Sequence, residues 1–534
     1  MKQFLCVLLC FGLAIGMMAC GMGGPENLPE VSPATTYDGT QISLSDTAIT
    51  VDGNAVSQDP SADVYAANDI VYYESGKDFL YGEGSDEDAH TSQEAAEHTV
   101  VHITAPGQYV LSGKLSCGQI AVDLGEDAKD DPNAVVTLVL NDVDITCQVA
   151  PAVIFYRVYE CGSTDDPTAT VDTSKAGANV ILGDGTENNI EGAYVAKIYK
   201  PDSVVLSDDG KEVEDAKKLH KYDGAFYSKM SMNIDGSGTL NINAANEGLD
   251  SEMHLTLNGG NINIKSGNDG INTNEDGVSV TTVNGGNLNI LVNGSTGEGD
   301  GIDSNGWLVI NGGTVVSQAC SFSGDAGIDS DMGIHINGGT VFATGNMLDR
   351  ISESKQNFAV FQFNTAQRVS MYADVFRTYT LKDSDENTVI SGSVENDFSY
   401  LIVSSPDLIT GEYTLWHGSN QFSGSTGTIG GGMGWFPGNI QLPEGSEMPE
   451  MPDNAPPEGM EDMTPPESFE KGQRPDGMQR PEGMERPDGM QRPDGMQQPE
   501  GNYGFISPVS SIFKIEEGAN YFVDVAHVGA VRLT

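Results

Sequence analysis

The sequence predicts an all-β chain whose central part is a parallel β-helix, a solenoid in which short strands stack coil upon coil. Three observations support this class. A phrase of the type Asp-Gly-Ile-Asp-Ser recurs between residues 222 and 345, Asn-Gly-Gly corners follow its copies, and the runs between them alternate apolar and polar residues. The corners recur every 26 or 27 residues. Such a period, made of strands and glycine corners, is typical of stacked repeats that share one core.

The repeated phrase stands at 247–251, 269–273, 300–304 and 325–330, with a weaker copy at 223–228. Alternation in the runs that follow predicts strands with Leu255, Leu308 and Ile334 facing inward. The glycines of each corner supply the positive φ that a sharp bend needs. The corner asparagines are interpreted as a structural amide ladder and are assigned no ligand; they are Asn258, Asn284, Asn311 and Asn337.

Stacking places the acidic residues of the phrase close to one another. Neighbouring strands lie ~4.8 Å apart, so unneutralised carboxylates in register would repel strongly. Calcium takes six to eight oxygen ligands, and ions between rungs suit that spacing. The sequence therefore predicts Ca²⁺ ligands at Asp223, Asp250, Asp269, Asn272, Asp300, Asp303, Asp325 and Asp329, with Glu247 nearby. The alternative is that these residues form solvated turns, and a nonapeptide calcium roll is disfavoured because its nine-residue period is missing.

Two aromatic residues are candidates for sugar binding. With Leu255 and Leu308 facing inward, His254 and Trp307 are predicted to point outward at equivalent places on different coils. An exposed indole on a flat β surface can stack on a sugar ring. The alternative is that Trp307 packs under a loop. Calcium bridging protein carboxylates to uronates is a second possible route to glycan binding.

Composition and the N-terminus indicate a location outside the cytoplasm. The net charge of −52, from 26 basic and 78 acidic residues, makes nucleic acid and anionic membrane surfaces poor partners. Residues 1–19 resemble a lipoprotein signal peptide, and Cys20 is the predicted lipidated residue that anchors the chain to a membrane. A tether follows at 20–36. Ordinary secretion with nearby cleavage is the alternative.

The remaining chain divides into four predicted parts. Residues 37–347 contain N-terminal strands and the β-helix, and residues 348–442 contain spaced strands that suggest an antiparallel β module capping the solenoid. Residues 443–502 carry an Arg-Pro-Asp-Gly-Met-Gln repeat whose proline and glycine predict a disordered insertion. Residues 503–534 supply the module's last strands. Cys117, Cys147, Cys161 and Cys320 show no metal-ligand spacing, and their pairing is left open.

The order of motifs resembles a family of bacterial surface carbohydrate-binding proteins. The resemblance rests on the runs 102–113, 118–120, 138–141 and 182–188, on Asp223-Gly224-Ala225 and on the Asn-Gly-Gly rungs, and it covers roughly residues 40–430. It implies a right-handed parallel β-helix related in architecture to pectate lyases, with bound calcium and affinity for cellulose or polygalacturonate. This chain departs from the family pattern in an excursion at 197–222 and in its C-terminal insertion.

These observations favour a calcium-stabilised, monomeric, lipid-anchored binder of plant-type or cell-wall polysaccharide at the cell surface, without catalysis. A lyase needs a basic residue to abstract a proton, and the block 223–345 contains no Arg and only Lys229 and Lys265. A hydrolase needs one acid and base pair at a defined separation, whereas these Asp residues recur in register. The alternatives are an adhesin or wall scaffold without a sugar ligand and, more remotely, a calcium-dependent lyase.

Overall fold

The computed structural model describes residues 36–164, 167–369, 377–427 and 509–528. Within these ranges the chain is almost entirely β, and the single α-helix is α1 (Ser92–Ala96). Two short 3-10 turns, η1 (Ala128–Asp130) and η2 (Pro201–Ser203), interrupt the strands. The prediction of an all-β chain is confirmed.

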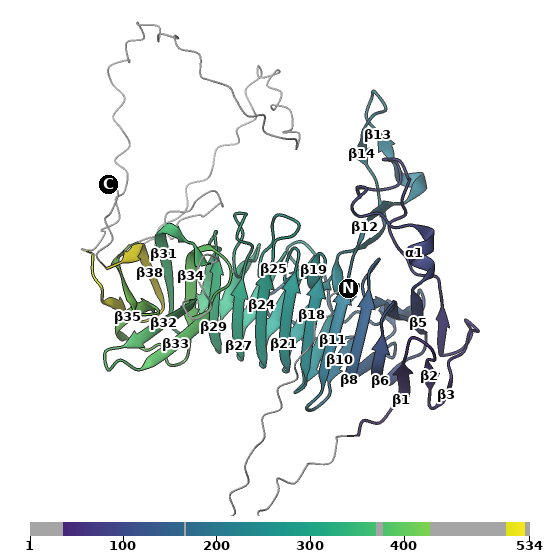
Figure 1. The fold of residues 1–534 in the computed structure, drawn as a ribbon, viewed down its shortest axis with the longest axis horizontal. Coiled ribbons are helices and arrows are strands. Elements are labelled where there is room, and N and C mark those ends of the chain that lie inside the picture. The colour runs from purple at the N-terminus through teal and green to yellow at the C-terminus, as the bar shows by residue number, and fades with distance from the viewer. Residues whose placement is uncertain (1–35, 165–166, 370–376, 428–508, 529–534) are drawn as a thin grey trace, which may run out of the picture.

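The central coils stack through three ladders of parallel strands, called ladders 1, 2 and 3 (Figure 1). Ladder 1 contains the first half of β8 (Val136–Cys147), β10 (Ala178–Leu182), β17 (Met232–Gly236), β20 (Leu255–Leu257), β23 (Val280–Val283), β26 (Trp307–Ile310), β28 (Gly333–Ile336) and β30 (Ile351–Ser354). Ladder 2 contains the second half of β8, β11 (Glu187–Gly192), β18 (Thr239–Ala244), β21 (Asn261–Ser266), β24 (Asn287–Val292), β27 (Thr314–Gln318) and β29 (Thr340–Gly345).

Ladder 3 carries the repeated acidic phrase. It contains β5 (Thr99–Ile103), β7 (Gly118–Asp123), β9 (Val153–Arg157), β16 (Gly224–Ser228), β19 (Glu247–Ser251), β22 (Ile271–Thr273) and β25 (Ile302–Ser304). In the regular coils the chain visits ladders 3, 1 and 2 in turn, so every coil places one strand on each side of the core.

The core runs between the ladders. Leu255, Thr281, Leu308 and Ile334 pair in register along ladder 1, and all four are fully buried, as predicted for the three apolar residues. Leu249, Ile271 and Ile302 fill the equivalent column of ladder 3. Since side chains alternate along a strand, the residue after each of these lies on the outer face of ladder 3.

The N-terminal end is closed by irregular strands. β6 (Gly107–Leu115) pairs in parallel with β8 and with β1 (Thr40–Leu44), and β2 (Thr50–Val51) and β3 (Asn54–Ala55) turn back from β1. β4 (Val64–Ala67) pairs antiparallel with β5. The predicted excursion forms a protruding hairpin from β12 (Val195–Tyr199) to β15 (Lys218–Tyr222), with β13 (Val205–Leu206) and β14 (Val213–Asp215) between them (Figure 1).

At the other end, antiparallel strands surround a second hydrophobic core that includes Phe361, Phe398 and Phe422. The strands are β31 (Phe358–Gln367), β32 (Thr378–Asp383), β33 (Thr388–Ser393), β34 (Phe398–Ser404), β35 (Gly411–His417), β36 (Asn420–Thr426), β37 (Phe513–Ile515) and β38 (Ala519–His527). β34 pairs antiparallel with β29, the last strand of ladder 2, whereas β31 and β38 pair in parallel. This module therefore covers the end of the coil stack (Figure 1).

Several predictions fall on residues outside the described ranges. They are the signal peptide at 1–19, Cys20, nearly all of the tether and the insertion at 443–502. Within the described ranges, no helix has the length and apolar character to cross a membrane. The four later cysteines, Cys117, Cys147, Cys161 and Cys320, are free thiols.

The corner glycines generate the first testable prediction. Gly286 has φ +80, and a Cβ there would lie 2.5 Å from the carbonyl oxygen of Gly260 in the coil below. Gly185 has a similar φ of +72 with open space around it. Gly185→Ala should cost about 1–2 kcal/mol of unfolding free energy from backbone strain alone, and Gly286→Ala at least ~1 kcal/mol more because coils must separate. Equal losses in denaturant titration would contradict close coil stacking.

Candidate functional site

The predicted acidic column exists on the outer face of ladder 3. Asp250, Asn272 and Asp303 are direct partners in the parallel register of β19, β22 and β25. The backbone N–H of Asp329 donates to the carbonyl of Ile302 at 2.7 Å, which extends the stacking by one coil. The repeated phrase therefore builds the ladder of oxygen-bearing side chains that the sequence indicated.

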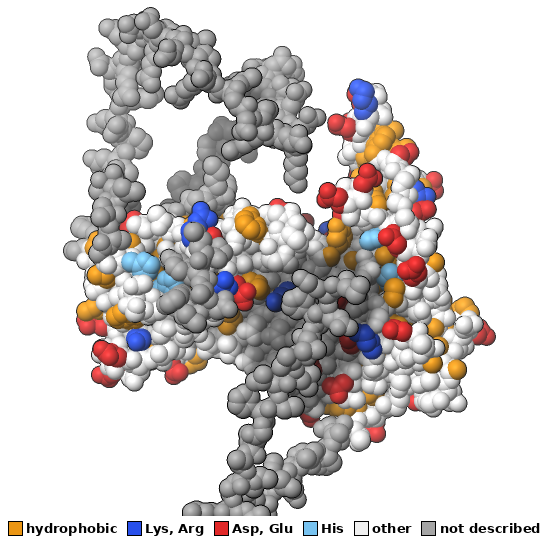
Figure 2. Space-filling model, in the orientation of Figure 1, with side chains coloured by type: hydrophobic (Ala, Val, Ile, Leu, Met, Phe, Trp, Pro, Cys, Tyr) orange, Lys and Arg blue, Asp and Glu red, His pale blue; other side chains and the backbone are white. Residues whose placement is uncertain are grey.

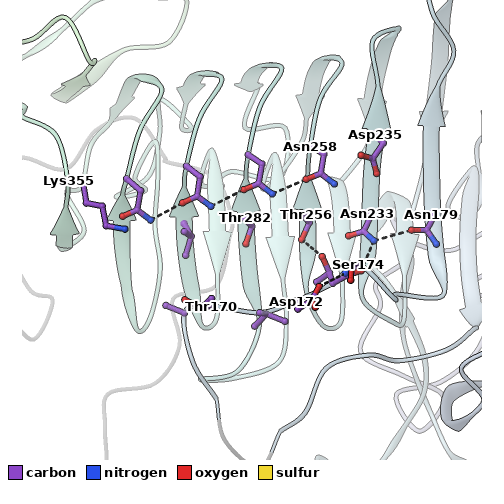
Figure 3. Close-up of a pocket in the computed structure, with 17 residues that line it drawn as sticks. Thr170, Asp172, Ser174, Asn179, Asn233, Asp235, Thr256, Asn258, Thr282 and Lys355 are labelled. Atoms are coloured by element: carbon purple, nitrogen blue, oxygen red, sulfur yellow. Dashed lines mark hydrogen bonds between the residues drawn. The ribbon is translucent and has the colours of Figure 1, made fainter.

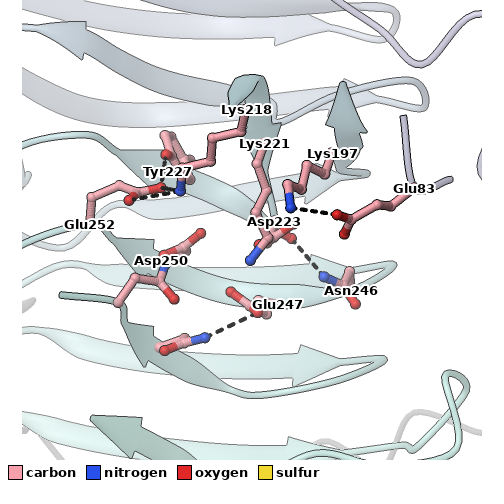
Figure 4. Close-up of polar contacts among 12 residues, drawn as sticks. Glu83, Lys197, Lys218, Lys221, Asp223, Tyr227, Asn246, Glu247, Asp250 and Glu252 are labelled. Atoms are coloured by element: carbon pink, nitrogen blue, oxygen red, sulfur yellow. Dashed lines mark hydrogen bonds and ion pairs between the residues drawn. The ribbon is translucent and has the colours of Figure 1, made fainter. Parts of the chain in front are cut away.

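Three carboxylates converge at one end of this column. Ligand oxygens of Asp223, Glu247 and Asp250 all lie within 4.8 Å of one another, and the three side chains are buried (Figure 4). We call these three residues the acidic cluster. Asp223 directly precedes β16, while Glu247 and Asp250 belong to β19, so two adjacent coils supply the cluster. The sequence predicts Asp223 and Asp250 as ligands and places Glu247 near them, so the cluster adds Glu247 to the predicted ligands.

The cluster has more oxygens than hydrogen-bond donors. The amide of Asn272 donates to Glu247 Oε1 at 3.1 Å, and that of Asn274 donates to Asp250 Oδ1 at 2.7 Å. The second oxygen of each carboxylate, Glu247 Oε2 and Asp250 Oδ2, is buried without a partner, as is Asn272 Oδ1. Unpartnered buried oxygens are costly. Carboxylate and amide oxygens are also the ligands that calcium prefers, so the donor set fits this ion.

Two lysines of the protruding hairpin lie over the cluster (Figure 4). Lys221 Nζ pairs with Asp223 Oδ2 at 2.6 Å, and Lys218 Nζ pairs with Glu252 at 3.4 Å. Glu252 also accepts a hydrogen bond from the hydroxyl of Tyr227 at 2.6 Å. One lysine thus neutralises one of the three clustered carboxylates, which leaves an excess of negative charge. Sequence reasoning missed Lys221 because it stands in the irregular excursion rather than in the repeat.

Burial and crowding act together on the pKa values of these acids. Burial, and then the neighbouring carboxylates, raise the pKa of Glu247 and of Asp250 well above the usual range. Burial also raises the pKa of Asp223, although Lys221 opposes that shift. Further along the column, burial and nearby acids raise the pKa of Asp303 and of Asp329 to about 7. A bound cation would relieve this repulsion, as would protonation.

The first acid of each later phrase has a different role. Asp269 Oδ1 accepts the N–H of Asp300 at 2.7 Å, and Asp300 Oδ1 accepts the N–H of Ala326 at 2.5 Å. Asp325 Oδ2 accepts the N–H of Gly299 at 2.6 Å. These carboxylates therefore hold neighbouring coils together through backbone donors. The structure does not bring them, Asp303 or Asp329 into the acidic cluster.

The two predicted sugar-binding residues have different positions. His254 was predicted to be an outward-pointing sugar-binding residue, but it is only 2% exposed and so is not open to a glycan. Its Nδ1 accepts the N–H of Val280 at 3.1 Å. The chain around Gly162 packs against its ring, so a polar segment that the repeat pattern did not reveal covers it. Trp307 begins β26 and is half-buried, and its role in sugar stacking stays a prediction.

A polar groove of about 650 Å³ runs across the outer face of ladder 1 (Figure 3). Its floor includes Asn233, Thr256 and Thr282, and the corner asparagines line one side. The segment 169–174 forms the opposite wall. The groove was not predicted because its floor uses ordinary strand threonines and its wall comes from a segment without a motif. Figure 2 shows charged side chains over the hairpin, the N-terminal strands and the C-terminal module.

Fold and sites together define an all-β protein of stacked parallel strands with a buried acidic cluster and an open polar groove. The chain belongs to the family described as carbohydrate-binding domain-containing protein, whose model matches residues 97–392, more than half of the chain. A carbohydrate-binding domain-containing protein from Acetivibrio thermocellus is 30% identical over 167 residues, covering 31% of this chain and 45% of that protein. The chain thus matches less than half the length of this relative.

A solved structure is also similar to part of the chain. It is a gadolinium derivative of the polysaccharide lyase-like protein from C. thermocellum, with a TM-score of 0.32 and 20% sequence identity. The match covers 57% of this chain and 94% of that protein. A TM-score this low supports no inference about this chain.

The raised pKa values predict how stability depends on pH. Asp269, Asp303 and Asp329 have pKa values of about 7, against an ordinary value of 3.8. Acids whose pKa is raised by folding stabilise the folded state below their ordinary pKa, and that stability is lost as pH rises through the folded value. Metal-stripped protein should therefore melt at lower temperature at pH 8 than at pH 5, and saturating Ca²⁺ should reduce the difference. A flat profile without metal would contradict the crowding of carboxylates.

Lys221 supplies a second prediction. Lys221→Met removes the ionic partner of the buried Asp223. Because the Lys221 side chain is itself 39% exposed and water screens the pair, metal-free stability should fall by about 1–2 kcal/mol. The loss of a positive charge beside the cluster should at the same time increase Ca²⁺ affinity. Lys211, whose Nζ pairs with Asp209 at 2.8 Å in an exposed position, is the matched control, and Lys211→Met should change stability by less than about 1 kcal/mol. Unchanged calcium affinity in Lys221→Met, measured by titration calorimetry, would exclude the cluster as the cation site.

Proposed function

We propose that this protein is a cell-surface lipoprotein, anchored at Cys20, whose calcium-stabilised right-handed parallel β-helix binds polysaccharide without catalysis. The ligand class is an acidic, polygalacturonate-like or a β-linked, cellulose-like glycan, and the protein acts as a monomer. Membership of the carbohydrate-binding domain-containing family supports the polysaccharide partner. The three stacked parallel ladders support a β-helix.

The observation that carries the calcium proposal is the set of unpartnered buried oxygens in and beside the acidic cluster. Glu247 Oε2, Asp250 Oδ2 and Asn272 Oδ1 would hold the ion together with Asp223. Calcium would supply the positive charge that offsets their repulsion and would tie two or three coils together. The cluster is buried under the hairpin, so an ion held there would stabilise the fold and would not be exposed to a glycan.

Absence of catalysis is part of the proposal. The acids of the cluster are buried, and Lys221, the basic group paired with it, is engaged by Asp223 at 2.6 Å. A base that removes a proton from a substrate must reach it within hydrogen-bond distance. The alternatives are a wall-associated adhesin or scaffold with no sugar ligand and a calcium-dependent lyase. A lyase would release unsaturated uronate products, which ultraviolet absorbance detects.

Calcium dependence tests the proposal directly. The soluble chain from residue 21 onward should melt at a higher temperature with Ca²⁺ than with chelator, since a ligand at 100 times its Kd adds ~2.7 kcal/mol. Pull-down on cellulose and polygalacturonate should retain the protein when calcium is present. A melting temperature that is the same with Ca²⁺ and with chelator would contradict the proposed structural ion. Stabilisation without retention on any glycan would favour the adhesin or scaffold.

A further inference from the structure

The groove on ladder 1 is built from side chains that repeat in two columns. Asn179, Asn233, Thr256, Thr282 and Val309 are partners in the strand register and form its floor. The second column runs along the corners and consists of Asp235, Asn258, Asn284, Asn311 and Asn337. Both columns run from coil to coil, so the groove follows the long direction of the stack (Figure 3).

The corner asparagines use only part of their hydrogen-bonding capacity in the ladder. Asn284 Nδ2 donates to Asn258 Oδ1 at 2.8 Å, Asn311 donates to Asn284 at 2.9 Å, and Asn337 donates to Asn311 at 2.8 Å. A primary amide has two N–H donors and two acceptor lone pairs. In the ladder, the inner amides of Asn284 and Asn311 each use one N–H donor and one acceptor lone pair. Each therefore has one donor and one acceptor left for a ligand, at a spacing of ~4.8 Å.

The wall at 169–174 is fixed against the floor. Thr173 and Thr256 share a hydrogen bond between their hydroxyls at 2.8 Å, and Asn233 Nδ2 donates to the carbonyl of Thr173 at 2.8 Å. Asn233 is only 5% exposed, and its Oδ1 is buried without a partner. These hydrogen bonds fix the wall to the floor, so the groove is preformed and does not have to be ordered when a ligand binds. Asn233 Oδ1 remains an unsatisfied acceptor within it.

The charge of the groove distinguishes between classes of glycan. Among its lining residues the charged ones are Asp172, Asp235 and Lys355, which leaves one net negative charge. Amides and hydroxyls dominate the rest, and aromatic side chains do not contribute to the lining. A polyuronate would need a bridging cation here. The cation site proposed above lies on ladder 3, where Asp250 is 0% and Glu247 is 5% exposed, so an ion held there is enclosed by protein.

We propose that this groove binds a neutral, linear polysaccharide chain that lies along the solenoid axis, with the corner asparagines and Thr282 contacting sugar hydroxyls. The inference rests on the proposed function and names its site and substrate class. A hydroxyl both donates and accepts, which matches the one free donor and one free acceptor on each inner amide. The corner asparagines, interpreted from the sequence as structural only, would then also contact the ligand.

Three variants test this site. Thr282→Trp places a bulky side chain on the floor, Asn284→Ala removes one corner amide, and Asn263→Ala is the matched control. Asn263 has the same two ladder bonds, donating to Asn241 at 2.9 Å and accepting from Asn289 at 3.0 Å, but it lies on ladder 2 outside the groove. All three are first checked for unchanged melting within a few degrees in Ca²⁺.

Binding of cellohexaose and hydroxyethylcellulose is compared with that of polygalacturonate, all in Ca²⁺. The proposal expects the wild type to bind the neutral glucans, Thr282→Trp to lose roughly tenfold or more in affinity, Asn284→Ala to lose about three- to tenfold and Asn263→Ala to be unchanged. If Thr282→Trp binds neutral glucans as tightly as the wild type does, the groove is not the binding site, although the proposed function still stands. Binding of polygalacturonate alone would overturn the neutral class. Binding of no polysaccharide would overturn the proposed function itself.

Discussion

In a stack of parallel strands, every side chain lies ~4.8 Å from its equivalent in the coils above and below. This constraint determines most of the structure. Apolar residues in register give the continuous core, and amides in register give hydrogen-bonded ladders such as Asn258 to Asn337. Carboxylates in register repel one another. The repulsion within an acidic column must therefore be offset by a backbone N–H donor, a lysine, a proton or a metal ion.

On ladder 3, different acids are stabilised in different ways. Asp269, Asp300 and Asp325 accept backbone N–H groups from the adjacent coil. Asp223 has Lys221, which reaches it from the hairpin. Glu247 and Asp250 each retain one oxygen with no partner, and burial raises the pKa of both well above the usual range. A cation bound by the unpartnered oxygens of Glu247 and Asp250 would therefore stabilise the coils.

The regular part of this architecture could be predicted from the sequence because it repeats. The phrase at 247–251 and its copies predicted the register that pairs Asp250, Asn272 and Asp303. The second glycine of each corner has the expected positive φ, from +77 to +84. The irregular segments could not be predicted in the same way. His254 is covered by the chain near Gly162, and the wall at 169–174 comes from a segment without a motif. Lys221 stands just before Asp223, but it belongs to the irregular hairpin and not to the repeat. Both candidate sites depend on such segments, so their final composition required the tertiary structure.

Equilibrium dialysis of the wild type and of Glu247→Gln, which gives the number of Ca²⁺ ions bound per chain, tests whether a cation neutralises the acidic cluster. This substitution keeps the size of the side chain and the donor contact from Asn272 but removes the charge and one carboxylate oxygen. We expect the variant to stay folded and to bind at least one ion fewer than the wild type. An unchanged number of bound ions, or a wild type that binds none, would contradict this expectation.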